Sequence, residues 1–396
     1  MGVSHLVQST RAGADAGFAL SGVIILALIL KYPFFEYGPR YTAATGESLI
    51  DGYGRIGIWA VWLYLAITLS TALIVQTAVI LFTSFLIQVT FGLSLPLPAI
   101  AALLLIVCAT ILRVGKFKLL DRTIKIILVI LTISTACAAT LTLPRVDFQT
   151  IALWPPVSAA VPFAFIIALA GWMPSAIDIA AWSSVWTVAK DQERGIRTTM
   201  AHALLDFRIG YIATGGLAFA FLLLGAGVMY QSGTAFNNAG PQFSLQLIDL
   251  YSQTLGEWTR PIVFAAVVTT MFSTALTVVD GFPRVIARTV DVIRTANTQS
   301  VRYGDTGTVY QIAGLVLGVL TVIVVALFAG SLTVMIDFAT IVSFMTGPIL
   351  GYLNLRAVTG PNVATQYQPG RTLMILSYSG IVLLGGTAIF YLVTLW

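Results

Sequence analysis

The sequence predicts an all-α membrane protein that crosses the bilayer many times, and three observations support this fold class. Hydrophobic residues make up 58% of the 396 residues, and Asp, Glu, Lys and Arg only 9%, whereas a soluble domain carries roughly 25% charged residues. The mean hydropathy is +0.93. The apolar runs are continuous and lack the two-residue alternation of a membrane β-barrel. The same composition excludes a disordered chain, a nucleic-acid binder and a disulfide scaffold.

Ten stretches are long and apolar enough to cross a membrane, which takes about 20 residues of helix. The charge-free run from Ile56 to Leu112 is too long for one helix, and Pro96 and Pro98 divide it. The shorter segment Gly2–Ala14 precedes these stretches and makes eleven elements. The expected spans are Phe18–Ala43, Ile56–Val89, Pro98–Leu112, Thr123–Leu143, Ser158–Ala189, Ile209–Met229, Pro261–Val285, Val309–Ala329, Leu332–Leu355 and Leu373–Trp396.

Inter-helix segments that are rich in basic residues alternate with segments that are poor in them. The poor segments hold Arg11, Arg145 and Arg260, and Lys31 lies inside a span. Because basic loops stay in the cytoplasm, we expect the rich segments inside, the C-terminus outside, and the chain in the plasma or inner membrane. The rich segments contain Arg40, Arg55, Arg113, Lys116, Lys118, Arg122, Lys125, Lys190, Arg194, Arg197, Arg208, Arg284, Arg288, Arg294, Arg302, Arg356 and Arg371.

The span Ser158–Ala189 contains the signals of a helix that is interrupted inside the membrane. Pro174 removes a backbone donor and clashes with the preceding turn, and Gly171 lies three residues before it. Carbonyls freed at this depth are tolerated where they line a cavity, and interrupted helices mark transporter binding sites. We therefore expect the substrate site here, close to Asp178; the alternative is a simple proline kink.

A second interrupted helix is expected five spans earlier, which is the start of the chain. The segment Gly2–Ala14 looks like the second half of such a helix. We expect its first half, about ten to fifteen apolar residues, to be encoded upstream of Met1.

Four segments resemble the natural resistance-associated macrophage protein (NRAMP) family of divalent-metal transporters, and the similarity covers nearly the whole chain. They look like the stretch after the family's Asp-Pro-Gly-Asn motif, the end of its second helix, its Met-Pro-His-Asn motif and its Met-Glu-Gly-Phe motif. The residues are, in the same order, Gln8-Ser9-Thr10-Arg11-Ala12-Gly13-Ala14, Ala44-Thr45-Gly46-Glu47, Met173-Pro174-Ser175-Ala176 and Val279-Asp280-Gly281-Phe282. The chain is similar to a divergent branch of the family.

The resemblance implies a LeuT-type fold, in which two inverted five-helix repeats form the transport unit and an eleventh helix follows. The chain would then be one transmembrane domain, residues 1–396, with its first helix truncated. The first repeat would lie at about 1–143, the second at about 158–355 and the extra helix at about 373–396.

At the substrate site the resemblance implies a mixed set of residues. Met173 stands where the family has a metal-binding Met, and the carbonyl of Ala170 where the family has a carbonyl ligand. Gly2, His5 and Ser175 stand where the family has a metal-binding Asp, an Asn and a His. The third expected helix lacks the acids, and the ninth the arginines, of the family's proton route.

Met173, His5 and Asp178 are the candidate ligands by their own chemistry, and each has a plainer alternative. The thioether of Met173 favours Mn, Fe, Cd or Cu over Mg and Ca; otherwise it packs. The imidazole of His5 suits a transition metal; otherwise it is a hydrogen-bonded histidine at a helix break. Asp178 attracts a cation or carries a proton; otherwise it caps the following half-helix.

Charged residues inside other spans are candidates for gating or proton transfer. Glu36 and Arg40 are four residues apart on the second helix, which also carries Lys31, and Asp280 is likewise one turn from an arginine. Ion pairs within a helix are the plainer interpretation. Asp337, near the start of the tenth helix, is expected to face the outer vestibule.

The sequence therefore predicts a secondary transporter of divalent metal ions such as Mn²⁺ or Fe²⁺ that works by alternating access. The metal ion would be substrate, protons are the candidate coupling ion, and no resident cofactor is expected. The expected partners are the lipid bilayer and the metal ion, without nucleic acid; the oligomeric state is left open, and a monomer would suffice.

Three alternatives to this function remain at the level of the sequence. Another cation such as Mg²⁺, or a small organic solute, could use the same fold, because a fold does not decide its substrate. A non-transporting membrane sensor is the third. An enzyme is not expected, since the sequence contains no Walker motif, nucleotide fingerprint, His–Glu metal-hydrolase motif or nucleophile elbow.

Overall fold

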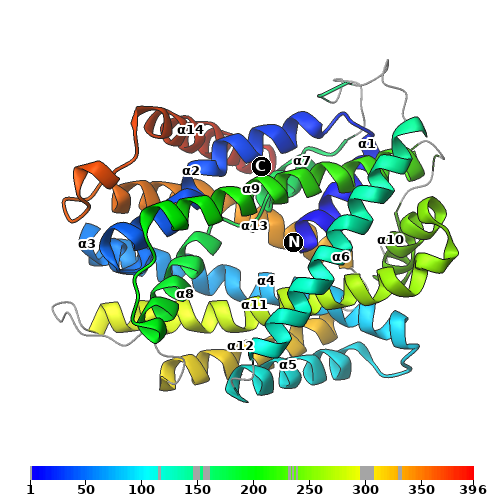
Figure 1. Ribbon diagram of the computed structural model, residues 1–396, viewed down its shortest axis with the longest axis horizontal. Coiled ribbons are helices and arrows are strands. Elements are labelled where there is room, and N and C mark those ends of the chain that lie inside the picture. Colours follow the sequence, from blue (N-terminus) through cyan, green and yellow to red (C-terminus); the bar gives the residue numbers. More distant parts are fainter. Residues whose placement is uncertain are drawn as a thin grey trace.

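The computed structural model describes residues 2–114, 117–145, 152–154, 161–230, 233, 236–237, 240–294, 307–328 and 332–396. Within these ranges the chain is helical and contains no β-strand, which confirms the all-α prediction. Eight of the described helices are long and apolar enough to cross a membrane. Most helices run along one common direction (Figure 1), the direction expected for the membrane normal.

The helices follow the expected order, and each of the eleven expected elements has a counterpart. The predicted span around Pro174 is divided between two helices, α7 and α8. The elements are η1 (Ser4–Ser9), α1 (Thr10–Ala16), α2 (Ser21–Thr45), α3 (Leu49–Ile56), α4 (Ile58–Phe91), α5 (Leu97–Val114), α6 (Phe117–Thr142), α7 (Phe163–Gly171), α8 (Ile179–Arg194), α9 (Met200–Leu224), η4 (Gly225–Tyr230), α10 (Gly240–Leu255), α11 (Arg260–Arg294), α12 (Thr308–Phe328), α13 (Leu332–Val358) and α14 (Arg371–Thr394).

Parts of some predictions fall outside the described residues. These are the start of the span predicted from Ser158, the end of the span predicted to Ala329, and Lys116 and Arg302 among the basic residues.

Two helices, α3 and α10, have no counterpart among the predicted spans. The start of α3 nevertheless has a sequence signal, because Ser48 and Asp51 form a capping box that satisfies two free amides at the helix start. Helix ends also differ from the prediction: α9 begins at Met200 and α11 continues to Arg294. The reason is that backbone hydrogen bonds continue a helix beyond its apolar part, where side chains no longer indicate its end.

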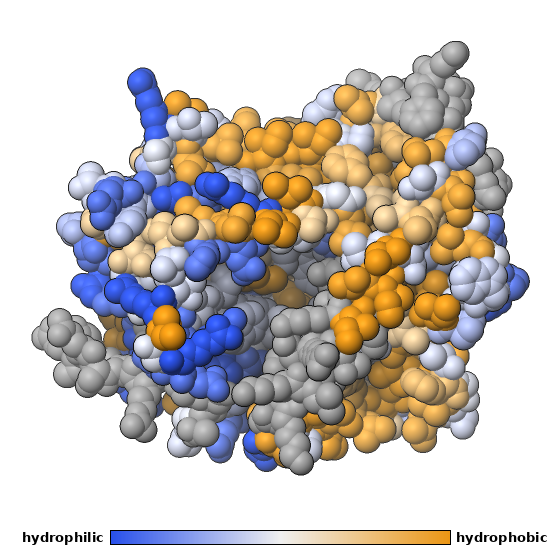
Figure 2. All heavy atoms as spheres, in the orientation of Figure 1, coloured by the Kyte–Doolittle hydropathy of each residue, from blue (hydrophilic) through white to orange (hydrophobic). Residues whose placement is uncertain are grey.

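The polar side chains of the spans lie inside the molecule and many apolar ones lie outside. Less than a third of the apolar window of each of the helices α5, α12 and α14 is buried, and Leu103, Leu315 and Val382 are exposed, while Lys31 and Glu36 of α2 are almost completely buried. Lipid as solvent requires this arrangement. Figure 2 shows hydrophobic residues over much of one face, with hydrophilic residues gathered at its left end, where α3 lies in Figure 1.

The two halves of the chain repeat one order of elements. In the first half, η1 and α1 are followed by the spans α2, α4, α5 and α6; in the second, α7 and α8 are followed by α9, α11, α12 and α13. Helix α14 comes last. This is the order of the LeuT-type fold, and the division at about 1–143 and 158–355 stays a prediction.

Two glycines let α1 approach the end of α9 closely. A Cβ on Gly13 would lie 2.0 Å from the carbonyl oxygen of Leu222, and a Cβ on Gly225 would lie 2.1 Å from that of Thr10. Small residues on both helices bring backbones together in membranes. The contact therefore positions the short α1 against a full span.

We expect Gly225→Ala to destabilise the protein by about 1–3 kcal/mol, because the added methyl group meets backbone that cannot rotate away. Thermal unfolding in detergent measures the effect. Gly216→Ala on α9 is the control, since nothing lies within 4 Å of its Cβ position. Equal melting temperatures of the two variants would contradict the close contact.

Candidate functional site

The predicted interruption lies between α7, which ends at Gly171, and α8, which begins at Ile179. Gly171 packs against α13 so closely that a Cβ would lie 2.0 Å from the carbonyl oxygen of Thr340. The last carbonyls of a helix have no partner within it. The interruption therefore presents backbone oxygens without the hydrogen bonds of a continued helix in the interior of the molecule.

Lys31 of α2 satisfies these oxygens. Its Nζ donates to the carbonyls of Ala170 at 2.6 Å, Gly171 at 2.7 Å and Ser175 at 3.5 Å, and the residue is 1% exposed. An ammonium group has three donors and no acceptor, and the C-terminal end of a helix attracts positive charge. We call the carbonyls of Ala170, Gly171 and Ser175 the carbonyl cluster.

Asp178 is the acid next to this arrangement. It is buried and directly precedes α8, but its side chain makes no capping hydrogen bond to that helix. Its Oδ1 has no hydrogen-bond partner among the described residues, and its charge interacts with that of Lys31. The carboxylate thus balances the ammonium charge without bonding to it directly.

Met173 lies within the interruption and is completely buried. The Ala170 carbonyl, which the resemblance assigned to a metal ion, bonds to Lys31 instead. Ser175 contributes its backbone oxygen to the carbonyl cluster. The structure therefore brings the Ala170 and Ser175 carbonyls together on Lys31, which the sequence assigned to gating or proton transfer, and Met173 and Asp178 are buried in the same segment.

The start of the chain reaches the same interruption from the other side. The Ser4 hydroxyl donates to the carbonyl of Pro174 at 3.1 Å, and it lies 2.9 Å from Nδ1 of His5. Nε2 of His5 donates to the carbonyl of Thr214 in α9 at 3.1 Å. Both ring nitrogens thus lie against protein atoms, as the plainer interpretation of His5 expects.

Gly2, which stands where the resembled family has a metal-binding Asp, lies next to α11. A Cβ at this position would meet the side chain of Thr274 at 3.3 Å, and the Gly2 carbonyl accepts from the amides of His5 and Leu6 at 3.1 Å. The described residues contain no group of three or more His, Cys, Asp or Glu side chains that could hold a metal ion.

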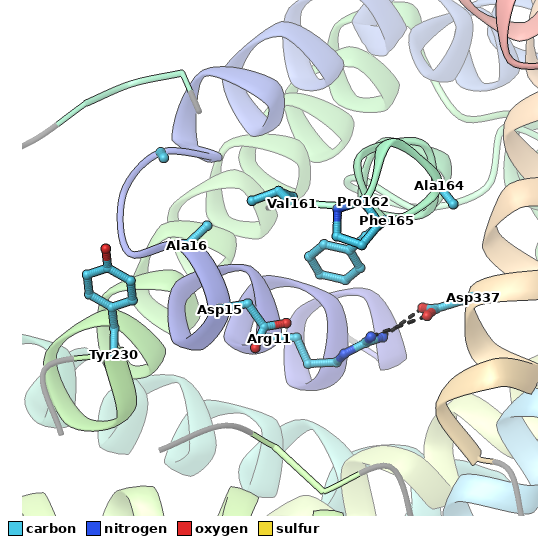
Figure 3. A pocket seen from close by; sticks show the side chains of 10 residues that line it. Arg11, Asp15, Ala16, Val161, Pro162, Ala164, Phe165, Tyr230 and Asp337 are labelled. Carbon is cyan, nitrogen blue, oxygen red and sulfur yellow. Dashed lines mark hydrogen bonds and ion pairs between the residues drawn. The ribbon is translucent and has the colours of Figure 1, made fainter. Parts of the chain in front are cut away.

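A cavity of about 470 Å³ lies between α1, α7, α13 and η4 on the side predicted to face outward. Arg11 and Asp337 line it and form a bidentate ion pair at 2.7 and 3.2 Å (Figure 3). Gln8 donates to Asp337 at 3.0 Å, and the Arg11 guanidinium lies 4.6 Å from the centre of the Phe165 ring. The ion pair therefore joins α1 to α13 at the wall of the cavity, and that this side faces outward stays a prediction.

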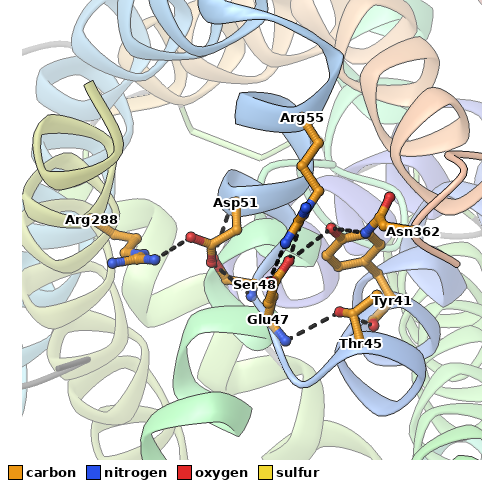
Figure 4. A network of polar contacts seen from close by, with 8 residues as sticks. All are labelled: Tyr41, Thr45, Glu47, Ser48, Asp51, Arg55, Arg288 and Asn362. Atoms are coloured by element: carbon orange, nitrogen blue, oxygen red, sulfur yellow. Dashed lines mark hydrogen bonds and ion pairs between the residues drawn. The ribbon is translucent and has the colours of Figure 1, made fainter. Parts of the chain in front are cut away.

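A second polar network joins α3 to α11 at the opposite end of the helices (Figure 4). Asp51 accepts from the backbone of Ser48 at 2.9 Å and forms an ion pair with Arg288 of α11. Glu47 accepts from Nε of Arg55 at 2.9 Å. By the predicted orientation, this network lies on the cytoplasmic side.

The ion pairs predicted within helices are confirmed, and both have partners in other segments. Oε1 of Glu36 accepts from Nη2 of Arg40 at 2.6 Å, and Arg40 also donates to a carbonyl outside α2. Asp280 pairs with Arg284 at 2.8 Å and accepts from Trp186 at 2.7 Å. Oε2 of Glu36 is buried without a hydrogen-bond partner among the described residues, and the proton or gating role of both acids stays a prediction.

The Arg11–Asp337 contact was not predicted, although Arg11 was assigned to a segment poor in basic residues and Asp337 to the outer vestibule. They are 326 residues apart, so no local spacing indicates the pair. The signal that remains is general: a charge near the membrane core needs an opposite charge, and these two lie at the same predicted end of the molecule.

The amino-acid sequence was compared with known families and proteins. No model of a known protein family matches the chain. The chain is 33% identical over 363 residues to the uncharacterized protein PM0681 of Pasteurella multocida, a match that covers 90% of this chain and 82% of that protein.

Two solved transporters have similar structures. A manganese transporter of Eremococcus coleocola superposes with a TM-score of 0.69 at 12% identity, over 98% of this chain and 83% of that one. MhsT in complex with L-phenylalanine superposes with a TM-score of 0.67 at 13% identity, over 100% and 96% of the two chains. These similarities show the LeuT-type fold.

We expect Asp337→Asn to open the cavity, because it removes the charge that holds α1 to α13. A partly exposed pair contributes about 1 kcal/mol, or roughly fivefold in rate. The measurement is the rate at which an introduced Ala164→Cys, in the cavity wall, reacts with a membrane-impermeant thiol reagent in intact cells.

Asp249→Asn is the matched control, because Asp249 pairs with Arg260 at 3.0 Å, and neither residue lines the cavity. The same rate in the Asp337→Asn and Asp249→Asn backgrounds would show that the Arg11–Asp337 pair does not close the cavity.

Proposed function

Since the chain belongs to the same family as PM0681 of Pasteurella multocida, itself uncharacterized, and has the LeuT-type fold, we propose that it is a secondary transporter. It moves a small substrate across the membrane by alternating access, with the substrate bound at the interruption between α7 and α8. The observation that carries this proposal is the interrupted helix itself, which places backbone oxygens, Met173 and Asp178 together in the interior.

The position of the two polar networks supports alternating access. The Arg11–Asp337 pair joins α1 to α13 on one side of the interruption, and the Asp51–Arg288 pair joins α3 to α11 on the other. Each pair connects different helices, so one can open while the other stays closed. Such a pair of barriers around a fixed site is what alternating access requires.

The substrate that we propose first is a divalent transition-metal ion such as Mn²⁺ or Fe²⁺. Met173 offers a soft thioether, which favours these metals over Mg²⁺ and Ca²⁺, and Asp178 offers a carboxylate oxygen without a hydrogen-bond partner among the described residues. Once Lys31 moves away, the oxygens of the carbonyl cluster would complete the ligands of the metal ion. The resemblance to the NRAMP family supports the same substrate.

A small organic solute is the second candidate, and the position of Lys31 favours it. The ammonium already occupies the carbonyl that a metal ion would use, and Gly2 supplies no carboxylate. A neutral or zwitterionic solute would not have to compete with that charge.

Uptake into proteoliposomes separates the two candidates. We expect the full chain to take up Mn²⁺, and Met173→Ala to raise its KM for Mn²⁺ roughly tenfold, as the loss of a metal-supporting group does. The KM for Mg²⁺, if that ion is carried, should change less, because the thioether contributes little to binding a hard ion. Metal-sensitive dyes inside the vesicles report the rates.

Met229→Ala is the matched control, because Met229 is buried in η4, away from the interruption, and its loss leaves a similar void. No uptake of any divalent ion by the wild type would refute the metal substrate. Unchanged KM values in Met173→Ala for every metal would favour the organic solute.

A further inference from the structure

We propose that the carbonyl cluster is a binding site for a monovalent cation and that the ammonium group of Lys31 is its resident cation. An incoming cation has to displace this group before it can use the same oxygens. The site and its occupant come from different helices, α7 with the following segment and α2, which are 139 residues apart in the chain.

The geometry is that of a bound ion. The two shorter distances, 2.6 and 2.7 Å, are at the short end of the range for charged donors. All three bonds go to backbone carbonyls, and none to a carboxylate, although Glu36 lies on the same helix and Asp178 is nearby. Carbonyl oxygens that replace the hydration shell of an ion form the cation sites of channels.

The groups around Lys31 explain why its ammonium bonds to the carbonyl cluster and does not form an ion pair with a carboxylate. Glu36 pairs with Arg40 through Oε1, and the bonds of the Lys31 ammonium go to carbonyl oxygens and not to this carboxylate. The C-terminal end of α7 adds the negative end of a helix dipole, and Asp178 supplies a formal charge. A cation at this position is therefore stabilised by the backbone, with a carboxylate that balances its charge from outside the cluster.

This arrangement has a consequence for transport, which rests on the proposed function. A substrate that uses the Ala170 carbonyl exchanges places with a side chain that cannot leave the protein. When the substrate is released, the tether returns the ammonium to the carbonyl cluster, so the empty transporter never leaves these oxygens unpaired.

Chemical rescue tests the proposal without any transport measurement. Lys31→Ala removes three methylene groups and the ammonium, which together correspond to n-propylammonium. We expect Lys31→Ala to lower the Tm in detergent and added n-propylammonium to recover at least half of that loss, because a ligand of the folded state raises its stability. n-Propanol, which has the same length without the charge, should recover little.

Leu30→Ala is the matched control, because Leu30 is the neighbouring buried residue of α2 and its loss leaves an apolar void. Its Tm should not respond to n-propylammonium. Equal rescue of Lys31→Ala by propanol and propylammonium would show that the space and not the charge matters, and would overturn the proposal. So would a failure of propylammonium to raise the Tm of a folded Lys31→Ala.

A second variant covers the case in which Lys31→Ala does not fold. Lys31→Met keeps most of the length of the side chain and loses its charge and its donors. We expect its Tm to lie well below that of the wild type, and an unchanged Tm would contradict a resident cation. Because these are stability measurements, rescue together with absent metal uptake would refute the metal substrate and leave the cation site standing.

Discussion

The contact between the Lys31 ammonium and the carbonyl cluster is the interaction on which the rest of the structure depends. An interrupted helix exposes carbonyls at a depth where no lipid group can donate to them, and each unsatisfied polar group there costs several kcal/mol. A buried ammonium is costly in the same way. Each removes the cost of the other, so the interruption and the lysine are stable only together.

Helix α13 packs against the interruption and also contacts helices at both ends of the molecule. Gly171 rests against the backbone of Thr340, three residues after Asp337, which holds Arg11. Further along α13, Asn354 accepts from the Tyr53 hydroxyl of α3 and donates to the carbonyl of Phe34 in α2 at 3.0 Å. Movement of α7 against α13 would therefore reach both polar networks.

Much of the fold could be predicted because lipid imposes strong rules on a sequence. Apolar length gave the spans, and Gly171 with Pro174 gave the interruption, since both signals are local. Helix α3 was missed although Ser48 and Asp51 form a recognisable cap, because a search for apolar runs passes over an eight-residue helix. The ends of α9 and α11 were missed because charged residues do not end a helix.

The site was predicted less completely, because its contacts join distant residues. Met173, Ala170, Ser175 and Asp178 lie in one segment, and the sequence could place them together. The acceptors of Lys31 could not be inferred from the sequence. Glu36 lies on the same helix and is a plausible partner for Lys31, but it pairs with Arg40. His5 was a candidate metal ligand from its chemistry and from its place in the resemblance, while its ring contacts Ser4 and Thr214.

The central claim is that the substrate binds at the interruption between α7 and α8, where Lys31 now lies. Anomalous scattering from crystals of the full chain grown with Mn²⁺ tests it most directly. The account predicts an anomalous peak beside the Met173 sulfur and the Ala170 carbonyl, with the Lys31 ammonium moved off the carbonyl cluster. A manganese peak elsewhere in the membrane interior, with Lys31 still bonded to Ala170 and Gly171, would contradict it.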